Sequence, residues 1–166
     1  MSILDPTPPD AAGFLAFVRT QMGITPQQLP DASPYFAVAF AVALEIVNKA
    51  IACASPLMYK LAVYNLGGSN LLNYAQDPIP IVPYPPGMNP PSEIGFFAYT
   101  RKAYNMLGFV SGVINAAADE STSESMIVPD AFKDLTLANL QQLKDPYGRR
   151  YLEIAQDYGP NVWGLS

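Results

Sequence analysis

The chain has 166 residues, of which 50% are hydrophobic and only 14% are charged, and its net charge at pH 7 is -5. This length predicts one domain, and the acidic balance argues against nucleic-acid binding as the main function, because such binders usually carry a basic stripe. The absence of histidine excludes Ser-His and Cys-His nucleophile pairs and histidine-ligated zinc, and a single cysteine, Cys53, excludes an intramolecular disulfide.

The N-terminal third predicts two helices. The first spans roughly 9–22, because Asp10 can cap its first turn and the apolar residues that follow recur at helical spacing. The second starts at Asp31 or Ser33 and runs to Ala54, with alanine, the best helix former, at many positions. Because this segment is apolar almost all round, we expect a central helix that is surrounded on most sides by others.

Glu45 and Lys49 are the charged residues of this second helix, and their spacing favours an ion pair on one helix face. Such a pair marks either an exposed stripe on a buried helix or a polar contact with a neighbouring subunit. The run 35–47 is the transmembrane candidate of the sequence, but a span needs about 20 apolar residues and polar residues interrupt this one. We therefore predict a buried helix, with Cys53 as a buried, inert thiol.

The middle of the chain predicts a third helix and a proline-rich arm. The helix begins after Ser55 and continues to about Ala75, with Gly67 and Gly68 expected to break or kink it. In the arm, residues 77–92, seven of the sixteen residues are proline, which excludes a helix or central strand and predicts an extended, polyproline-like chain. Its apolar residues pack either on a neighbouring subunit or on their own domain; they are Ile79, Ile81, Val82 and Tyr84.

A helix over 92–107 and a β-hairpin over 108–128 follow the arm. In the hairpin, we expect 108–115 to pair with 122–128 around a polar, acidic tip. An isolated two-stranded ribbon is only marginally stable in water. The hairpin would therefore gain most from pairing with a neighbour's strand or from docking on another protein.

Two helices and an extended tail complete the chain. A short helix spans 137–144, and Asp145 precedes the last helix, over 147–158. The tail, residues 158–166, contains the single tryptophan, Trp163. Because an apolar terminus is costly when exposed, we expect the tail to dock on the bundle or in a partner's groove, where an aromatic anchor is typical. The predicted docking residues are Tyr158, Pro160, Val162, Trp163 and Leu165.

The sequence predicts a mainly α fold: one domain over 1–166, a small helical bundle with the proline-rich arm, one protruding β-hairpin and an extended C-terminal tail. It carries no phosphate-binding, zinc-binding or nucleophile-elbow motif. The acidic cluster of Asp119, Glu120 and Glu124 lacks the spacing of a calcium loop. We therefore expect no enzyme activity, no cofactor and no metal site. The first ten residues have neither a basic nor an apolar region, so we expect no secretory signal.

The closing stretch, LTLANLQQLKDPYGRRYLEIAQDYGPNVWGLS, together with the predicted helical core and hairpin, resembles head-to-tail connector (adaptor) proteins of tailed bacteriophages. The resemblance lies in the ending YGRRYL…YGPNVWGLS, covers the last third of the chain, and extends to the rest only as architecture. Proteins of this family are helical bundles that form a ring beneath the portal. They often grip the portal with a C-terminal tail and receive the next tail component with loops or hairpins.

For this chain, the resemblance implies a structural virion protein in the neck between capsid and tail. It implies a homo-oligomeric ring, with a dodecamer as one candidate, that contacts the portal protein and a downstream tail component. DNA would pass through without being specifically bound, since acidic walls repel phosphate, and no membrane is involved. The tail would grip the portal, with Trp163 and Leu165 as anchors. The residues implied in inter-subunit contacts are Ile79, Ile81, Val82, Tyr84, Glu45 and Lys49.

Three alternatives stay open at this point. The first is another tail-completion protein of a virion, and the second is a monomeric α-helical ligand-binding or regulatory domain whose aromatic core holds an apolar molecule. The third is a small enzyme that uses carboxylates far apart in the sequence. The sparse charge favours the assembly function, because charged residues usually make up about a quarter of a soluble domain.

Overall fold

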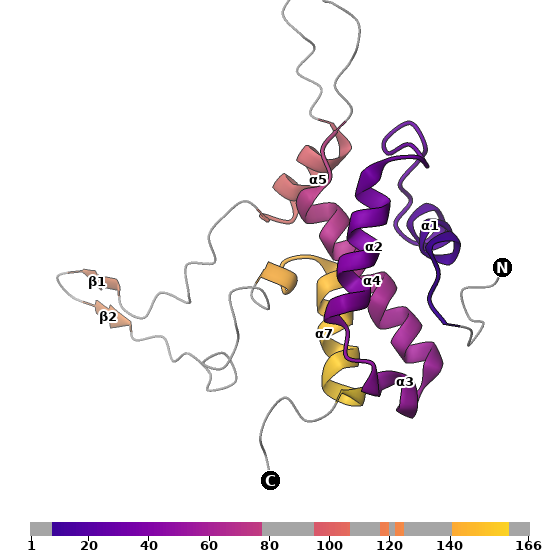
Figure 1. Ribbon diagram of the computed structural model, residues 1–166. Coiled ribbons are helices and arrows are strands. Elements are labelled where there is room, and N and C mark those ends of the chain that lie inside the picture. Colours follow the sequence, from indigo (N-terminus) through magenta and orange to yellow (C-terminus); the bar gives the residue numbers. More distant parts are fainter. Residues whose placement is uncertain (1–7, 78–94, 107–116, 120–121, 125–140, 160–166) are drawn as a thin grey trace, which may run out of the picture.

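The computed structural model describes residues 8–77, 95–106, 117–119, 122–124 and 141–159 (Figure 1). These residues are mainly α-helical, as predicted, and none of their helices is long and apolar enough to cross a membrane. Their helices are α1 (Ala11–Thr20), α2 (Pro34–Ile46), α3 (Ala50–Ala54), α4 (Pro56–Tyr74), α5 (Phe96–Ala103) and α7 (Pro146–Tyr158).

Polar residues cap the helices where the sequence predicted them. Asp10 accepts a hydrogen bond from the Gly13 amide at 2.6 Å, at the start of α1. Ser33 and Ser55 begin α2 and α4 in the same way, and each is followed by a proline, whose missing N–H costs nothing in a first turn. Asp145 begins α7 with two such hydrogen bonds. The starts of these helices are therefore determined locally.

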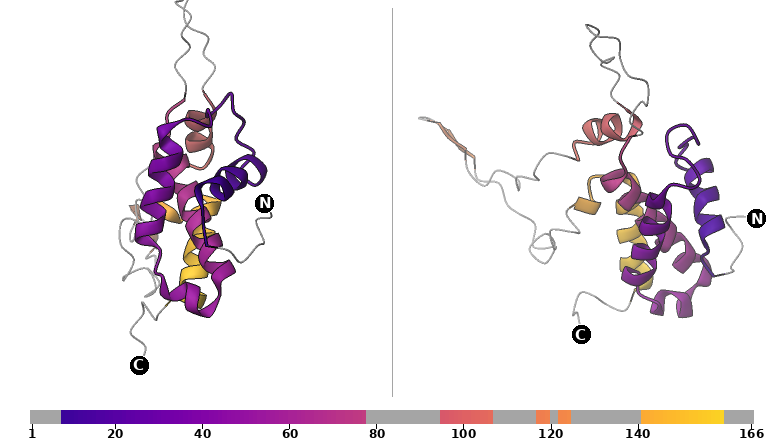
Figure 2. Two further views of the ribbon diagram at one scale, coloured as in Figure 1. Left: turned by 45° about the vertical axis from the view of Figure 1, so that its right-hand side comes forward. Right: turned by 45° about the horizontal axis from the view of Figure 1, so that its top comes forward.

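The central helix of the bundle is α4, so the prediction that α2 is central was wrong. Both α2 and α7 pack against α4, and α3 lies at the end of the bundle where α4 begins (Figures 1 and 2). All residues from Ala62 to Ser69 are buried. The polar ones among them are satisfied, since the Asn65 amide donates to the Leu61 carbonyl and Ser69 donates to Asp145. Because α4 contains these polar residues, its sequence did not indicate that it is the buried, central helix.

Gly67 and Gly68 do not break α4, which is continuous from Pro56 to Tyr74. A Cβ atom on Gly67 would lie 2.8 Å from the ring of Phe14, so the glycine lets α1 approach α4 closely. Phe14 in turn stacks on Phe40 of α2, with ring centroids 5.6 Å apart. The glycine pair therefore serves packing at the centre of an aromatic core rather than a kink.

The second predicted helix ends early. Val47 has extended backbone angles, φ −67° and ψ 124°, and α3 begins after Lys49. Glu45 therefore lies on α2 and Lys49 directly before α3, both are exposed, and these two described residues form no ion pair. Cys53 is also exposed, so the prediction of a buried thiol was wrong. It lies on α3, a short helix that buries Ile51.

Helix α5 begins at Phe96, later than predicted, because Asp77 from beyond α4 caps it. The carboxylate of Asp77 accepts hydrogen bonds from the amides of Phe97, at 2.8 Å, and Ala98, at 2.9 Å. Asp77 thus brings the two ends of the stretch 78–94 together. The arm residues that follow Asp77 lie outside the described part of the chain.

The predicted hairpin over 108–128 is not supported. The structure instead describes two three-residue strands, β1 (Ala117–Asp119) and β2 (Thr122–Glu124), which pair antiparallel with Ala118 opposite Ser123. They lie where the acidic tip was expected, and most of the β-branched residues of the prediction lie outside the described residues. Of the predicted helix over 137–144, only Gln141 and Gln142 are described as helical.

Candidate functional site: an apolar face on α2 and the groove beside it

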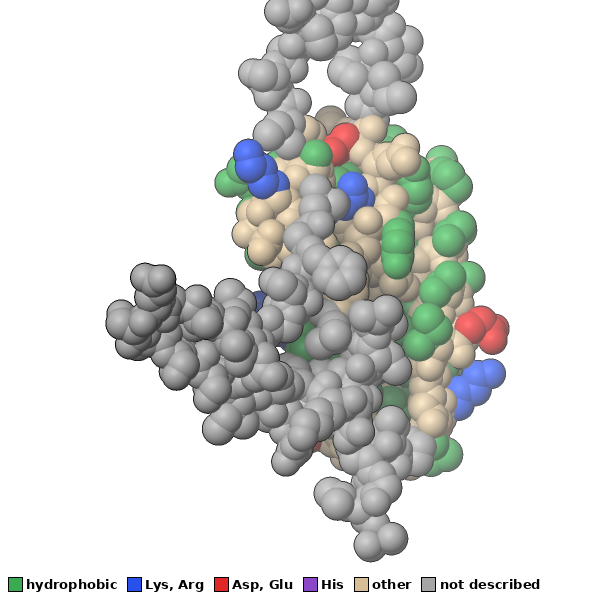
Figure 3. Space-filling model, turned by 90° about the vertical axis from the view of Figure 1, so that its left-hand side faces the viewer, with side chains coloured by type: hydrophobic (Ala, Val, Ile, Leu, Met, Phe, Trp, Pro, Cys, Tyr) green, Lys and Arg blue, Asp and Glu red, His purple; other side chains and the backbone are tan. Residues whose placement is uncertain are grey.

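One face of α2 is apolar and exposed to solvent. A neighbouring face packs on the core through Phe36, Ala39 and Ala43, whereas Val38, Val42 and Ile46 are 60%, 41% and 54% exposed. These three residues, spaced four apart, form one stripe, which we call the α2 face. Figure 3 shows hydrophobic side chains gathered along the side of the molecule on which α2 lies. A continuous exposed apolar stripe of this kind is typical of a surface that another protein covers.

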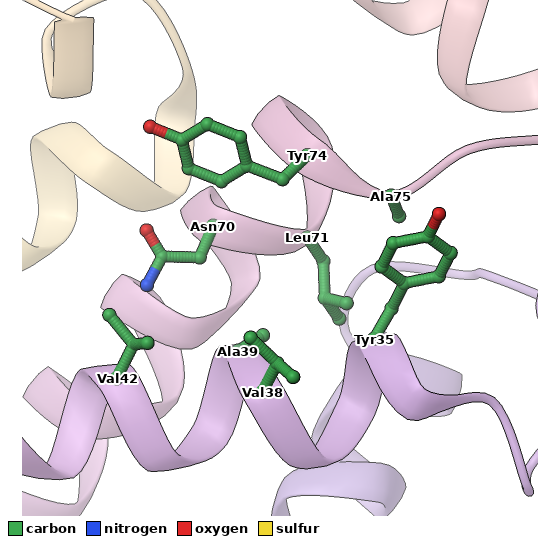
Figure 4. Close-up of a pocket in the computed structure, with 8 residues that line it drawn as sticks. All are labelled: Tyr35, Val38, Ala39, Val42, Asn70, Leu71, Tyr74 and Ala75. Carbon is green, nitrogen blue, oxygen red and sulfur yellow. The ribbon is translucent and has the colours of Figure 1, made fainter.

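A groove runs beside the α2 face, between α2 and the C-terminal end of α4. Its volume is about 120 Å³, and no charged residue lines it. Figure 4 shows the two tyrosines of the groove on either side of its aliphatic floor. We call it the α2–α4 groove; it is lined by Tyr35, Val38, Ala39, Val42, Asn70, Leu71, Tyr74 and Ala75.

Asn70 is the polar side chain of this groove that lacks a partner. Its amide nitrogen is buried and makes no hydrogen bond to any described residue. The side chain lies between Val42 and the ring of Tyr74, with the nitrogen directed toward Val42 (Figure 4). A buried donor without an acceptor costs about 1–3 kcal/mol. The groove therefore contains a polar group that would gain from an acceptor.

Arg101 of α5 holds the end of α4 that forms the groove. Its guanidinium donates to the Leu72 carbonyl at 2.7 Å and also to the Ala75 carbonyl. These carbonyls lie at the C-terminal end of α4, where no further helical amide follows to bind them. Burial lowers the pKa of Arg101, although the charge of Asp77 opposes this shift. The groove thus has a rigid rim that depends on α5.

A second hollow, of about 390 Å³, lies between α1 and the N-terminal end of α2. Small residues line much of it, and Asp31 adds one charge at its edge. The N-terminal half of α2 is therefore a ridge with a hollow on each side. A ridge flanked by two hollows offers another protein both a raised and a recessed surface to contact.

The described residues include one fully buried carboxylate, that of Asp145. They contain no group of three or more residues of the kinds that bind metals. Asp145 is the buried carboxylate, and all its contacts serve the fold: it accepts from the Ser69 hydroxyl at 2.7 Å and from the amides of Tyr147 and Gly148. Burial raises its pKa, and this effect outweighs the three hydrogen bonds.

The structure places three of the residues that the sequence indicated as contacts. Tyr158 is the last residue of α7 and is exposed, and Glu45 and Lys49 are exposed near the far end of α2. The other predicted contact residues lie outside the described part of the chain: Ile79, Ile81, Val82, Tyr84, Pro160, Val162, Trp163 and Leu165.

The α2–α4 groove was not predicted from the sequence. It joins residues about 30 positions apart on two helices, and no local pattern links them. The sequence held one signal for it: α2 is apolar on nearly every side, whereas a helix at the surface of a protein normally has a polar face toward the solvent. Comparisons with protein-family models, curated proteins and solved structures find nothing that matches this chain.

Proposed function

We propose that this protein is a structural subunit that assembles into a larger particle, specifically a head-to-tail adaptor in the neck of a virion. In this proposal it forms a ring between the portal and the tail and lets DNA pass. The observation that carries the assembly function is the α2 face, an apolar stripe left uncovered on an otherwise well-packed bundle. The position in a virion rests on the resemblance of the C-terminal third to adaptor proteins.

The dimensions of the α2–α4 groove also favour assembly over ligand binding. Pockets for small organic ligands usually enclose about 300–1,000 Å³, and this groove holds about 120 Å³. It fits one or two side chains of another protein better than a whole metabolite. The hollow beside α1, at about 390 Å³, falls within that range, so size favours assembly over ligand binding at the α2–α4 groove alone.

The remaining segments have defined roles in this proposal. The proline-rich arm over 77–92 and the segment over 108–128 would contact sister subunits or the next tail component. The tail over 158–166 would bind the portal, with Trp163 and Leu165 as anchors. The net charge of -5 fits a channel that DNA crosses without being held, because acidic walls repel phosphate.

The mass of the full-length chain in solution tests this proposal. We expect closed rings, either alone or after addition of the portal of the same virus, seen by light scattering and electron microscopy. Ile46→Asp places a charge on the α2 face outside the groove and should abolish rings while the helical circular dichroism is kept. Gln156→Asp, which adds the same charge at an exposed position of α7, is the matched control. A wild-type chain that stays monomeric with and without the portal overturns the proposal.

A further inference from the structure

We propose that the α2–α4 groove is the receptor for the proline-rich arm of a second copy of this chain. The inference rests on the proposed function, because it names the contact that joins one subunit to the next. The occupant is the stretch 79–84, in which prolines alternate with the apolar residues Ile79, Ile81, Val82 and Tyr84.

The aromatic side chains of the groove suit a proline-rich partner. Polyproline-type segments bind in shallow grooves lined by aromatic rings, where their rigid shape costs little entropy on docking. Tyr35 and Tyr74 lie on either side of this groove (Figure 4). The side chain of Tyr74 is 71% exposed, which is high for an aromatic residue. Its exposed ring provides a face for a proline or isoleucine.

Asn70 supplies the hydrogen bond that such a segment needs. A polyproline chain makes no internal hydrogen bonds, so its carbonyl groups seek donors outside it. The Asn70 nitrogen now faces Val42 and has no acceptor among the described residues. A half-turn of the terminal amide, whose torsion is soft, would exchange its two ends and direct the nitrogen away from Val42, to the side of Tyr74 (Figure 4). There it can donate to a carbonyl of the docked arm.

Charge and size agree with this occupant. The arm has no charged residue from Pro78 to Ser92, and no charged residue lines the groove. An acidic or basic peptide would therefore lose solvation on docking without gaining an ionic partner. A volume of about 120 Å³ accommodates single side chains of an extended segment, not a helix.

Both ends of the arm are fixed close to the groove, and the ring of the proposed function requires each arm to reach the groove of another copy. Asp77 is fixed on the first turn of α5, and the chain re-enters the structure at Gly95 beside it. The residues that flank the arm are therefore in contact with each other, near the groove. When each arm occupies the groove of the next copy, the contact is head-to-tail, which generates a ring if the rotation between copies closes.

Two variants of the full chain test the inference by complementation. The arm variant replaces Ile79, Ile81, Val82 and Tyr84 with serine, and the groove variant combines Asn70→Asp with Tyr74→Ala. Each alone should be folded, by circular dichroism, and monomeric. A mixture should form a one-to-one heterodimer, because the intact groove of the first binds the intact arm of the second. A mixture that stays monomeric, or an arm variant that assembles like wild type, overturns the inference.

A peptide of residues 77–92 provides an assay that does not depend on assembly. It should bind the arm variant, and Asn70→Asp, which keeps the shape but removes the donor, should weaken binding about tenfold. A peptide with the same composition in scrambled order is the control. If the peptide binds but no rings form, the proposed function is refuted and the groove remains a binding site for the arm. If rings form but the peptide does not bind, only the assignment of the groove as the arm's binding site is refuted.

Discussion

Asp145 offers the sharpest test of how this bundle is held together, because one fully buried carboxylate joins α4 to α7. It accepts hydrogen bonds from the Ser69 hydroxyl at 2.7 Å and from the amides of Tyr147 and Gly148, at 3.0 and 2.7 Å. Asp145→Ala leaves these three donors without an acceptor. At about 1 kcal/mol for each hydrogen bond, the free energy of unfolding falls by about 3 kcal/mol. Removal of the buried charge raises it again by about 1 kcal/mol.

We therefore expect Asp145→Ala to lower the free energy of unfolding by about 2 kcal/mol. Asp145→Asn keeps an oxygen for the two amides and can donate its nitrogen to Ser69, so it should lower that free energy by less than about 1 kcal/mol. Urea unfolding of the wild type and both variants measures these differences. If the alanine and asparagine variants are equally stable, the hydrogen bonds of Asp145 do not hold α7 to α4.

The pH dependence gives a second, independent check. Burial raises the pKa of Asp145 above its ordinary value of 3.8, so the folded state holds this proton more tightly than the unfolded state. The contribution of Asp145 to stability is thus greatest below pH 3.8 and is lost as the pH rises through the raised pKa. The wild type should lose stability relative to Asp145→Asn over that range. A wild type that instead gains stability relative to the variant would show that the hydrogen bonds outweigh burial.

Three further predictions concern α4, α5 and α3. Gly67→Ala should destabilise the chain by about 1–3 kcal/mol in urea unfolding, because its Cβ would meet the Phe14 ring at 2.8 Å. Gly68→Ala should be nearly neutral, because its Cβ would meet the flexible Met22 side chain and would lie at ordinary contact distance from Phe17. Arg101→Met should cost about 2 kcal/mol, since two carbonyls of α4 lose their donor, and a thermal scan that shows no loss would contradict this role. Cys53 should react fully with a thiol reagent in the native state; protection until denaturation would refute its exposure.

The helix starts were predictable because their causes are local. Ser33, Ser55 and Asp145 each combine a capping side chain with a following proline, and the structure uses all three in that way. The start of α5 was missed because its cap, Asp77, comes from 20 residues upstream. A contact between distant residues leaves no signal in a local pattern.

Burial was harder to predict than helix formation. Hydrophobicity indicated α2 as the centre, yet α4 is central although it contains Asn65 and Ser69, because each of these polar groups finds a partner inside the bundle. Such partners exist only once the helices have packed. The α2–α4 groove has the same origin, since the two helices that form it meet only in the folded chain. The sequence nevertheless predicted, from its sparse charge, that some apolar surface would need covering.

The cap that Asp77 places on α5 allows the arm to change during evolution while the helical bundle stays the same. Because the bundle closes on itself at Asp77 and Gly95, the intervening residues can be lengthened, shortened or exchanged at an entropic cost that grows only with the logarithm of their number. A lineage could retain the scaffold while its recognition sequence diverges. The same junction is a natural insertion point for an epitope tag or fluorescent reporter.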